Sequence, residues 1–257
     1  MRVYSFILLL LLAAGSAFAE NQYIPVAGLA PGANNTLFRT DVRIFNPAPY
    51  AIDVTLHFLP TGIDGSNISG RVFHIGPRQM LVLDNVVEHI NPGSTTALGA
   101  VRIDSDTDAS YAFLADSRTW TSSPNPQAPG SYGQFIPAMR PEEARLETVV
   151  LHLSNTPERR TNIGAMNPGP EAATVKATLY PWDGSSSLES APFVLPAMSM
   201  KQVSLADLFG GLFLVDGYVV FESTHPLFTW GSVIDNQSGD PFYIIGRESK
   251  EERIEIF

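Results

Sequence analysis

The amino-acid sequence predicts an all-β protein that contains two tandem antiparallel β-sandwiches. Three observations favour this fold class: apolar and polar residues alternate in short runs, turn-forming residues separate these runs, and the whole pattern occurs twice. The chain has 257 residues, of which 20 are Gly and 20 are Pro, and charged residues make up 16%. So many helix-breaking residues, with so little charge, argue against coiled coils and helical repeats.

Two segments of the chain are similar to each other. Residues 38–49 align without gaps with residues 159–170, and five of the twelve positions are identical. The identical pairs are Arg39/Arg160, Thr40/Thr161, Asn46/Asn167, Pro47/Pro168 and Pro49/Pro170. Similar Asn-Pro turns could arise by chance in any one block, but two further matched blocks keep the same order: residues 23–27 with 135–138, and residues 99–103 with 217–221. This collinear order predicts an internal duplication.

Period-two alternation indicates half-buried strands, whose apolar side chains are predicted to face a core. In the first copy these side chains are Val42, Ile44, Val54, Leu56 and Phe58. Further strands are expected near residues 71–75, 79–83, 98–104 and 110–116, and in the second copy near residues 161–166, 174–180, 191–195, 200–204, 217–222 and 228–234. Short helical turns are expected at residues 84–89 and 205–209, with Asp84 and Ser204 as caps. About six or seven short strands per copy favour an immunoglobulin-like sandwich.

The first 19 residues have the features of a secretory signal peptide. Arg2 provides a positive charge, residues 6–14 are apolar, and Ala17-Phe18-Ala19 fits a small-x-small cleavage site. The apolar run is shorter than the about 20 residues that a transmembrane helix requires, so an uncleaved anchor is the less favoured alternative. Cleavage after Ala19 predicts an exported protein, located in the periplasm or outside a bacterial cell.

The pattern divides the chain into five parts. They are the signal peptide at residues 1–19, the first sandwich at 20–120, a linker at 121–133, the second sandwich at 134–247, and a charged C-terminal tail at 248–257. The linker segment contains three Pro, three Ser and two Gly, a composition typical of a semi-stiff connection. A long loop inside one domain is the alternative.

The composition and the missing motifs exclude several classes of function. The chain has no Cys, which excludes disulfide scaffolds, thiol catalysis and zinc ribbons. Its formal net charge of −10 argues against a nucleic-acid partner, because phosphate binding requires clustered cations. No hydrolase, metalloprotease, phosphate-loop or dinucleotide motif occurs. The sequence therefore predicts a protein with no catalytic residues, no cofactor and no membrane span in the mature chain.

One acidic run resembles the opening of a calcium-binding loop. Asp104, Asp106 and Asp108 place three carboxylates at alternate positions, and calcium prefers clustered oxygen ligands. However, Ala109 and Ala115 occupy the positions where such a loop has its Gly and its Glu. A solvated turn rich in Asp is the favoured interpretation, and the three residues are retained as weak metal candidates.

Aromatic side chains suggest a second type of site. Trp120, Trp182, Trp230 and Tyr132 could stack on sugar rings, as flat aromatic surfaces do in carbohydrate-binding sandwiches. Aromatic residues more often close the ends of a core. The three Trp residues are retained as weak candidates for ligand binding.

Three features resemble modules of secreted bacterial repeat proteins. They are the Phe-Ile-Pro-Ala opening at residues 135–138, the Arg-Thr strand with its Asn-Pro turn at residues 160–168, and the closing run at residues 233–241. The resemblance covers about residues 22–247, although residues 115–120 of the first copy replace the closing run. It implies tandem immunoglobulin-like β-sandwiches of uncharacterised role and no catalytic residues.

The predicted function is binding through sandwich surfaces. The protein is expected to act as an exported structural, adhesive or accessory module, whose partner is an unknown protein or glycan surface. Two modules joined by a stiff linker could bind two places at once. A carbohydrate-binding or calcium-dependent module is the alternative, and an enzyme is the third hypothesis.

Overall fold

The protein is all-β and contains two antiparallel sheets of eight strands each, so the predicted fold class is confirmed at this level. The computed structural model describes residues 20–32, 36–105, 112–123, 125, 127 and 129–249. The predicted signal peptide and residues 250–257 of the predicted tail lie outside these residues. No helix in the described part of the chain is long and apolar enough to cross a bilayer.

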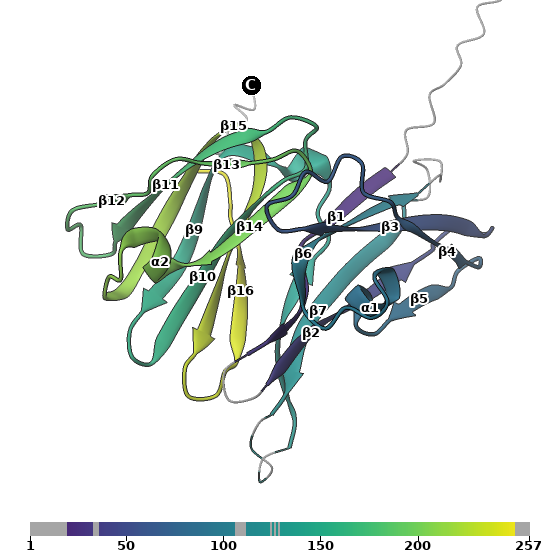
Figure 1. Cartoon of the computed structure of the whole chain (residues 1–257), viewed down its shortest axis with the longest axis horizontal. Helices are drawn as coiled ribbons and strands as arrows, with labels where there is room; N and C mark the ends of the chain where they lie inside the picture. Colours follow the sequence, from purple (N-terminus) through teal and green to yellow (C-terminus); the bar gives the residue numbers. More distant parts are fainter. Residues whose placement is uncertain are drawn as a thin grey trace, which may run out of the picture.

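The first sheet contains strands β1 to β8 (Figure 1). The strand order is β4-β3-β6-β1-β2-β7-β8, and β5 pairs with β2. A short helix, α1 (Val86–Ile90), connects β5 to β6. The strand bounds are β1 Glu20–Pro31, β2 Leu37–Phe45, β3 Ile52–Pro60, β4 Arg71–Ile75, β5 Met80–Leu83, β6 Ala97–Ser105, β7 Leu114–Ser122 and β8 Ser131–Pro137.

The second sheet contains strands β9 to β16. The strand order is β12-β11-β15-β10-β14, with β13 on β11 and both β9 and β16 on β15. A 3-10 turn, η3 (Pro141–Glu143), precedes β9, and helix α2 (Leu205–Phe209) connects β14 to β15. The strand bounds are β9 Arg145–Asn155, β10 Arg159–Asn167, β11 Ala173–Pro181, β12 Leu188–Glu189, β13 Phe193–Leu195, β14 Ser199–Ser204, β15 Leu214–Asp235 and β16 Pro241–Ile245.

The strand pairings of the two sheets follow the same order. β2 pairs with β5 and β7, and β10 pairs with β14 and β15. β8 closes the first sheet on β7, and β16 pairs with β15 in the same way. Just after these two strands, single bridges join Met139 to Tyr23 of β1 and Arg247 to Val149 of β9. By these pairings β9 is the counterpart of β1, whereas the sequence alignment had matched residues 23–27 with residues at β8.

β15 crosses from one layer of the second sheet to the other. Its first half pairs with β9 and β11, and its second half pairs with β10 and β16. The sequence predicted separate strands at residues 217–222 and 228–234, and this break is wrong. The register with β9 shifts between Glu222 and Leu227, so the chain changes layers here without a turn.

The alternation of residues in the first copy identified the core correctly. The five predicted inward side chains, Val42, Ile44, Val54, Leu56 and Phe58, are all buried.

The two predicted helical turns differ in their caps. Ser204 caps α2 as predicted, because its hydroxyl accepts a hydrogen bond from the Asp207 amide at 3.0 Å. At α1 the predicted cap is wrong. The N-cap residue is Asn85, and Asp84 instead forms an ion pair with Arg43 at 2.6 Å.

The segment predicted as a linker lies partly in a hairpin of the first sheet. β7 extends to Ser122 and β8 begins at Ser131, and these two residues face each other across the hairpin. β8 therefore pairs in the first sheet, although the sequence boundary assigned residues from 134 onward to the second copy. The chain passes to the second sheet after Pro137, through η3.

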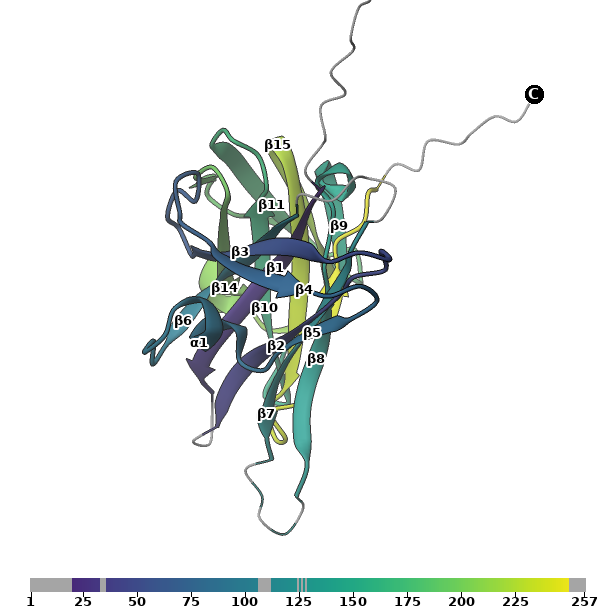
Figure 2. The same cartoon turned by 90° about the vertical axis from the view of Figure 1, so that its right-hand side faces the viewer.

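The two sheets pack directly against each other. The first sheet lies beside the second in Figure 1 and in front of it in Figure 2, and β14 of the second sheet contacts β6 and β3 of the first. One hydrophobic cluster joins residues of both, including Tyr23 with Met166, Met200 and Phe228. The Tyr23 and Phe228 ring centroids are 5.9 Å apart. A second cluster fills the interior of the second sheet alone. The shared cluster therefore packs the two halves of the chain against each other.

Candidate functional site

The Thr of the repeated Arg-Thr motif joins two strands in each copy. Thr40 Oγ1 accepts a hydrogen bond from the Gly28 amide at 2.9 Å, and Thr161 Oγ1 accepts one from the Ser154 amide at 3.1 Å. Both Thr side chains are buried. The motif therefore ties β2 to β1 and β10 to β9.

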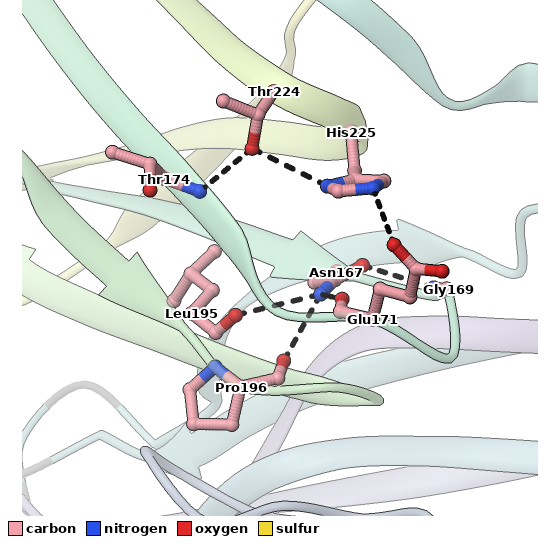
Figure 3. A network of polar contacts seen from close by, with 8 residues as sticks. All are labelled: Asn167, Gly169, Glu171, Thr174, Leu195, Pro196, Thr224 and His225. Carbon is pink, nitrogen blue, oxygen red and sulfur yellow. Dashed lines mark hydrogen bonds and ion pairs between the residues drawn. The ribbon is translucent and has the colours of Figure 1, made fainter.

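The Asn of the repeated motif holds a turn together from inside. Asn167 Nδ2 donates to the carbonyl oxygens of Glu171 at 2.6 Å and Pro196 at 3.0 Å, and its Oδ1 accepts from the Gly169 amide at 3.0 Å (Figure 3). The Asn167 side chain is fully buried. Because this buried amide forms its hydrogen bonds within the protein, Asn167 has a structural role in the turn.

Asn46 makes the matching contacts in the first copy. Its Nδ2 donates to the carbonyl oxygens of Tyr50 at 2.8 Å and Gly76 at 3.0 Å, and its Oδ1 accepts from the Ala48 amide at 2.9 Å. Asn46 is also fully buried. The residues that define the repeat thus have structural roles, and a functional site has to be sought elsewhere.

The closing run of the second copy forms the turn between β15 and β16. Asp235 Oδ1 accepts hydrogen bonds from the Ser238 amide at 2.6 Å and from the Gln237 amide at 3.0 Å. These hydrogen bonds hold the pKa of Asp235 below its usual value. Asn236 Nδ2 donates to the Pro157 carbonyl, which ties this turn to the β9–β10 turn. These hydrogen bonds give the closing run a structural role in the turn between β15 and β16.

Asp104, the first predicted calcium ligand, lies in an ion-paired cluster. Its Oδ2 atom is 3.0 Å from Arg102 Nη2 and 2.9 Å from His57 Nε2. Arg102 Nη1 also contacts Met198 Sδ at 2.9 Å, so the cluster lies at the contact between the two sheets. The Arg102 guanidinium already supplies positive charge to this carboxylate. Asp106 and Asp108 lie outside the described residues.

No metal-binding group emerges from the described ranges. Within residues 20–32, 36–105, 112–123 and 129–249, no three His, Cys, Asp or Glu residues are arranged to hold a metal ion.

Trp120 is enclosed by polar neighbours on the outer face of β7. Its Nε1 donates to Asp41 Oδ2 at 2.6 Å, and the Arg39 guanidinium lies 4.0 Å from its ring centroid. Arg118 lies 5.6 Å from the same ring. A sugar would have to displace Arg39 to stack on that face. Tyr132 lies in β8 opposite Thr121.

Trp182 is the exposed member of the three Trp candidates. It follows β11 directly, and its side chain is 70% exposed. Tyr180, two residues before Trp182, stacks on its cross-strand partner Tyr218, and the two ring centroids are 5.0 Å apart. This end of the second sheet therefore has an accessible aromatic ring.

Trp230, the third Trp candidate for ligand binding, does not lie at the surface. It is fully buried, and its ring covers Gly164, where an added Cβ would lie 2.2 Å from the ring. Its Nε1 donates to Gln202 Oε1 at 3.0 Å. Trp230 belongs to the cluster shared by the two sheets, so it cannot stack on a sugar at the surface.

A surface groove, which we call the edge groove, opens where β8, β9 and β16 meet. It has a volume of about 550 Å³, and its walls include Phe135, Pro137, Val149, Leu151, Tyr243 and Ile245. β8 pairs only with β7, and β16 pairs only with β15, among the strands of the described chain. Each of the two strands therefore has one edge without a ladder partner among the described strands.

The edge groove combines exposed apolar side chains with polar groups. Phe135 is 59% exposed and Leu151 is 48% exposed. Arg247 and Glu248 also line the groove. The Tyr243 hydroxyl is buried and has no hydrogen-bond partner among the described residues, and burial raises its pKa, which keeps it protonated as a donor. The edge groove therefore presents apolar side chains beside a cation, a carboxylate and an unpaired hydroxyl donor.

Sequence reasoning did not find the edge groove, because it depends on strands that are distant in sequence. β8 and β16 are 104 residues apart between Pro137 and Pro241, and only their shared position at the ends of the two sheets brings them together. In comparisons with known proteins, no family model and no curated protein sequence matches the chain.

Proposed function

We propose that this protein is an exported, non-catalytic binding module that holds an extended segment of a partner protein in the edge groove. The observation that carries the proposal is the meeting of two open strand edges with exposed apolar side chains, Phe135 and Leu151, in one groove. An extended peptide can add to an open edge through main-chain hydrogen bonds, while grooves for alternate side chains provide specificity.

The internal symmetry of the fold supports the wider interpretation as a tandem protein. The matched pairings of the two sheets, and the matched contacts of Asn46 and Asn167, support an origin by duplication of one sandwich of immunoglobulin-like type. Secretion, duplication and the immunoglobulin-like identity remain part of the proposal.

Charged substitutions in the edge groove test the proposal. Peptides that bind the protein are first selected from a library of extended sequences and measured by titration calorimetry. Phe135→Asp and Leu151→Asp are each expected to lower the affinity for these peptides by about tenfold or more. The reason is that the introduced carboxylate would have to be desolvated against apolar side chains. Hydrogen exchange should show slower exchange of β8 and β16 amides when a peptide is bound.

A matched control comes from the opposite part of the second sheet. Val194 in β13 is 60% exposed and does not line the edge groove, so Val194→Asp should leave peptide binding unchanged. Selected peptides that bind all three variants as well as the unsubstituted protein would contradict the proposal. So would peptides that protect neither β8 nor β16.

Trp182 favours a second candidate function, binding of a carbohydrate. Its 70% exposed ring lies at the end of β11, where it could stack on the apolar face of a sugar. A glycan array should then show a ligand whose binding is lost in Trp182→Ala and kept in Phe135→Asp. Binding that is the same with and without the Trp182 ring would refute this alternative.

A further inference from the structure

A second cavity, distinct from the edge groove, lies between the two sheets. This inter-sheet cleft has a volume of about 280 Å³, which is close to the lower size of small-molecule sites. Its lining comes from β1, β2, β6, β7 and β8 of the first sheet and from β10, β14, β15 and β16 of the second.

The two walls of the inter-sheet cleft differ in chemistry. The first sheet contributes mainly apolar side chains, among them Ala30, Phe38 and Leu98. The second sheet contributes Arg160, Asn162 and Gln202 together with Ser232. Arg160 is the only charged residue among the described residues that line the cleft. The cleft is therefore amphipathic, with its positive charge on one wall.

Arg160 and its counterpart Arg39 are used differently by the two copies. In the first copy Arg39 pairs in register with Trp120 and rests on its ring at 4.0 Å. In the second copy Arg160 pairs in register with Ile234, so no aromatic ring is available at the matching place. Ile234 stands where the first copy has Trp120, and Arg160 lines the cleft instead of lying on an aromatic ring.

Most of the hydrogen-bond donors of Arg160 are uncommitted. Its Nη1 donates to Asn236 Oδ1 at 2.5 Å, and its other N–H groups have no acceptor within the described part of the chain. Guanidinium groups with free N–H donors in a planar fork are suited to bind a carboxylate with two hydrogen bonds. Charge and geometry therefore favour an anion with two acceptor oxygens.

Gln202 adds a second donor with a fixed orientation. The indole Nε1 of Trp230 is a donor only, so the Gln202 atom that it contacts must be the carbonyl oxygen. The Gln202 amide NH₂ is then left as a donor, and it has no partner among the described residues. The Asn162 side chain also makes no hydrogen bond within the described chain. The polar wall thus offers several donors beside one cation.

We propose that the inter-sheet cleft binds a small organic carboxylate with an apolar body. The carboxylate pairs with Arg160 and receives a hydrogen bond from the Asn162 amide, two residues further along β10. The apolar body lies against Ala30, Phe38 and Leu98 of the first sheet. This inference does not depend on the edge groove, because the two cavities have no lining residue in common.

Benzoate and benzamide provide a matched pair of probes, because they have the same shape and differ in charge. The three Trp residues give three indole N–H signals in a nitrogen-15 correlation spectrum, which single Trp→Phe variants assign. Benzoate in the millimolar range is expected to shift the Trp230 indole signal, since that N–H donates to Gln202, which lines the cleft where the apolar body of the ligand lies. Benzamide is expected to bind at least about tenfold more weakly.

Three variants complete the test. Arg160→Ala should lower the affinity for benzoate by at least about tenfold. Arg39→Ala changes the matching position of the first copy and should leave benzoate binding unchanged. Ala30→Leu should fill the apolar wall and also weaken benzoate, which keeps the test valid if Arg160→Ala fails to fold. Equal effects of benzoate and benzamide, an unshifted Trp230 signal, or unchanged binding in Ala30→Leu would each overturn the proposal.

Discussion

Replacement of Trp230 by alanine is expected to lower the free energy of unfolding by about 3–5 kcal/mol. Trp230 is fully buried in the cluster that the two sheets share. Its loss opens a cavity between the sheets and leaves Gln202 Oε1 without its indole donor. Urea denaturation followed by circular dichroism measures the change.

The same experiment reports on cooperativity between the two sheets. Because Tyr23 and Phe228 join the shared cluster from opposite sheets, the unsubstituted chain should unfold in one transition. Trp182→Ala is the control, since a 70% exposed side chain should contribute within about 0.5 kcal/mol. A Trp230→Ala chain as stable as this control would show that the interface does not contribute to stability.

Replacement of either buried motif Asn by alanine is expected to cost about 2–4 kcal/mol. Asn46→Ala removes the donor to the Tyr50 and Gly76 carbonyls, and Asn167→Ala removes the donor to the Glu171 and Pro196 carbonyls. Each substitution leaves buried carbonyl oxygens without partners. The melting temperature and the urea midpoint measure both effects.

The comparison of the two Asn variants is itself informative. Since their contacts match, the two losses should be similar, and the exposed Asn67 provides the control through Asn67→Ala. A loss below about 0.5 kcal/mol at either Asn would contradict the structural role assigned to the repeated turn.

The parts of the fold that sequence reasoning predicted correctly are those with one covered face. Val54, Leu56 and Phe58 alternate with polar residues because only one side of β3 faces the first core. β1 lacks this signal because its residues from Gln22 to Leu29 are all buried, on both faces of the strand. Period-two alternation requires a solvated face, so the strand was not predicted.

The candidate sites depend on packing between the sheets, which a single sequence does not specify. Trp230 looks like any other aromatic residue in sequence, and only the contact of β15 with the first sheet buries it. Arg160 was found as a member of the repeat. Its position at a cleft follows from the pairing with Ile234 and from the sheet that lies opposite.

The β7–β8 hairpin places the boundary between the two sheets after β8 and not within residues 121–133. If the gene grew by duplication, the unit that was copied has to include the strand after the hairpin, because β8 completes the sheet to which β7 belongs. The bridges of Met139 to Tyr23 and of Arg247 to Val149 mark where each unit returns to its own first strand. A chain divided within residues 121–133 would lose the last strand of its first half, whereas a division after Met139 would keep both units whole. Recombination of such units is therefore expected to be tolerated at η3 and not at the Pro-rich hairpin.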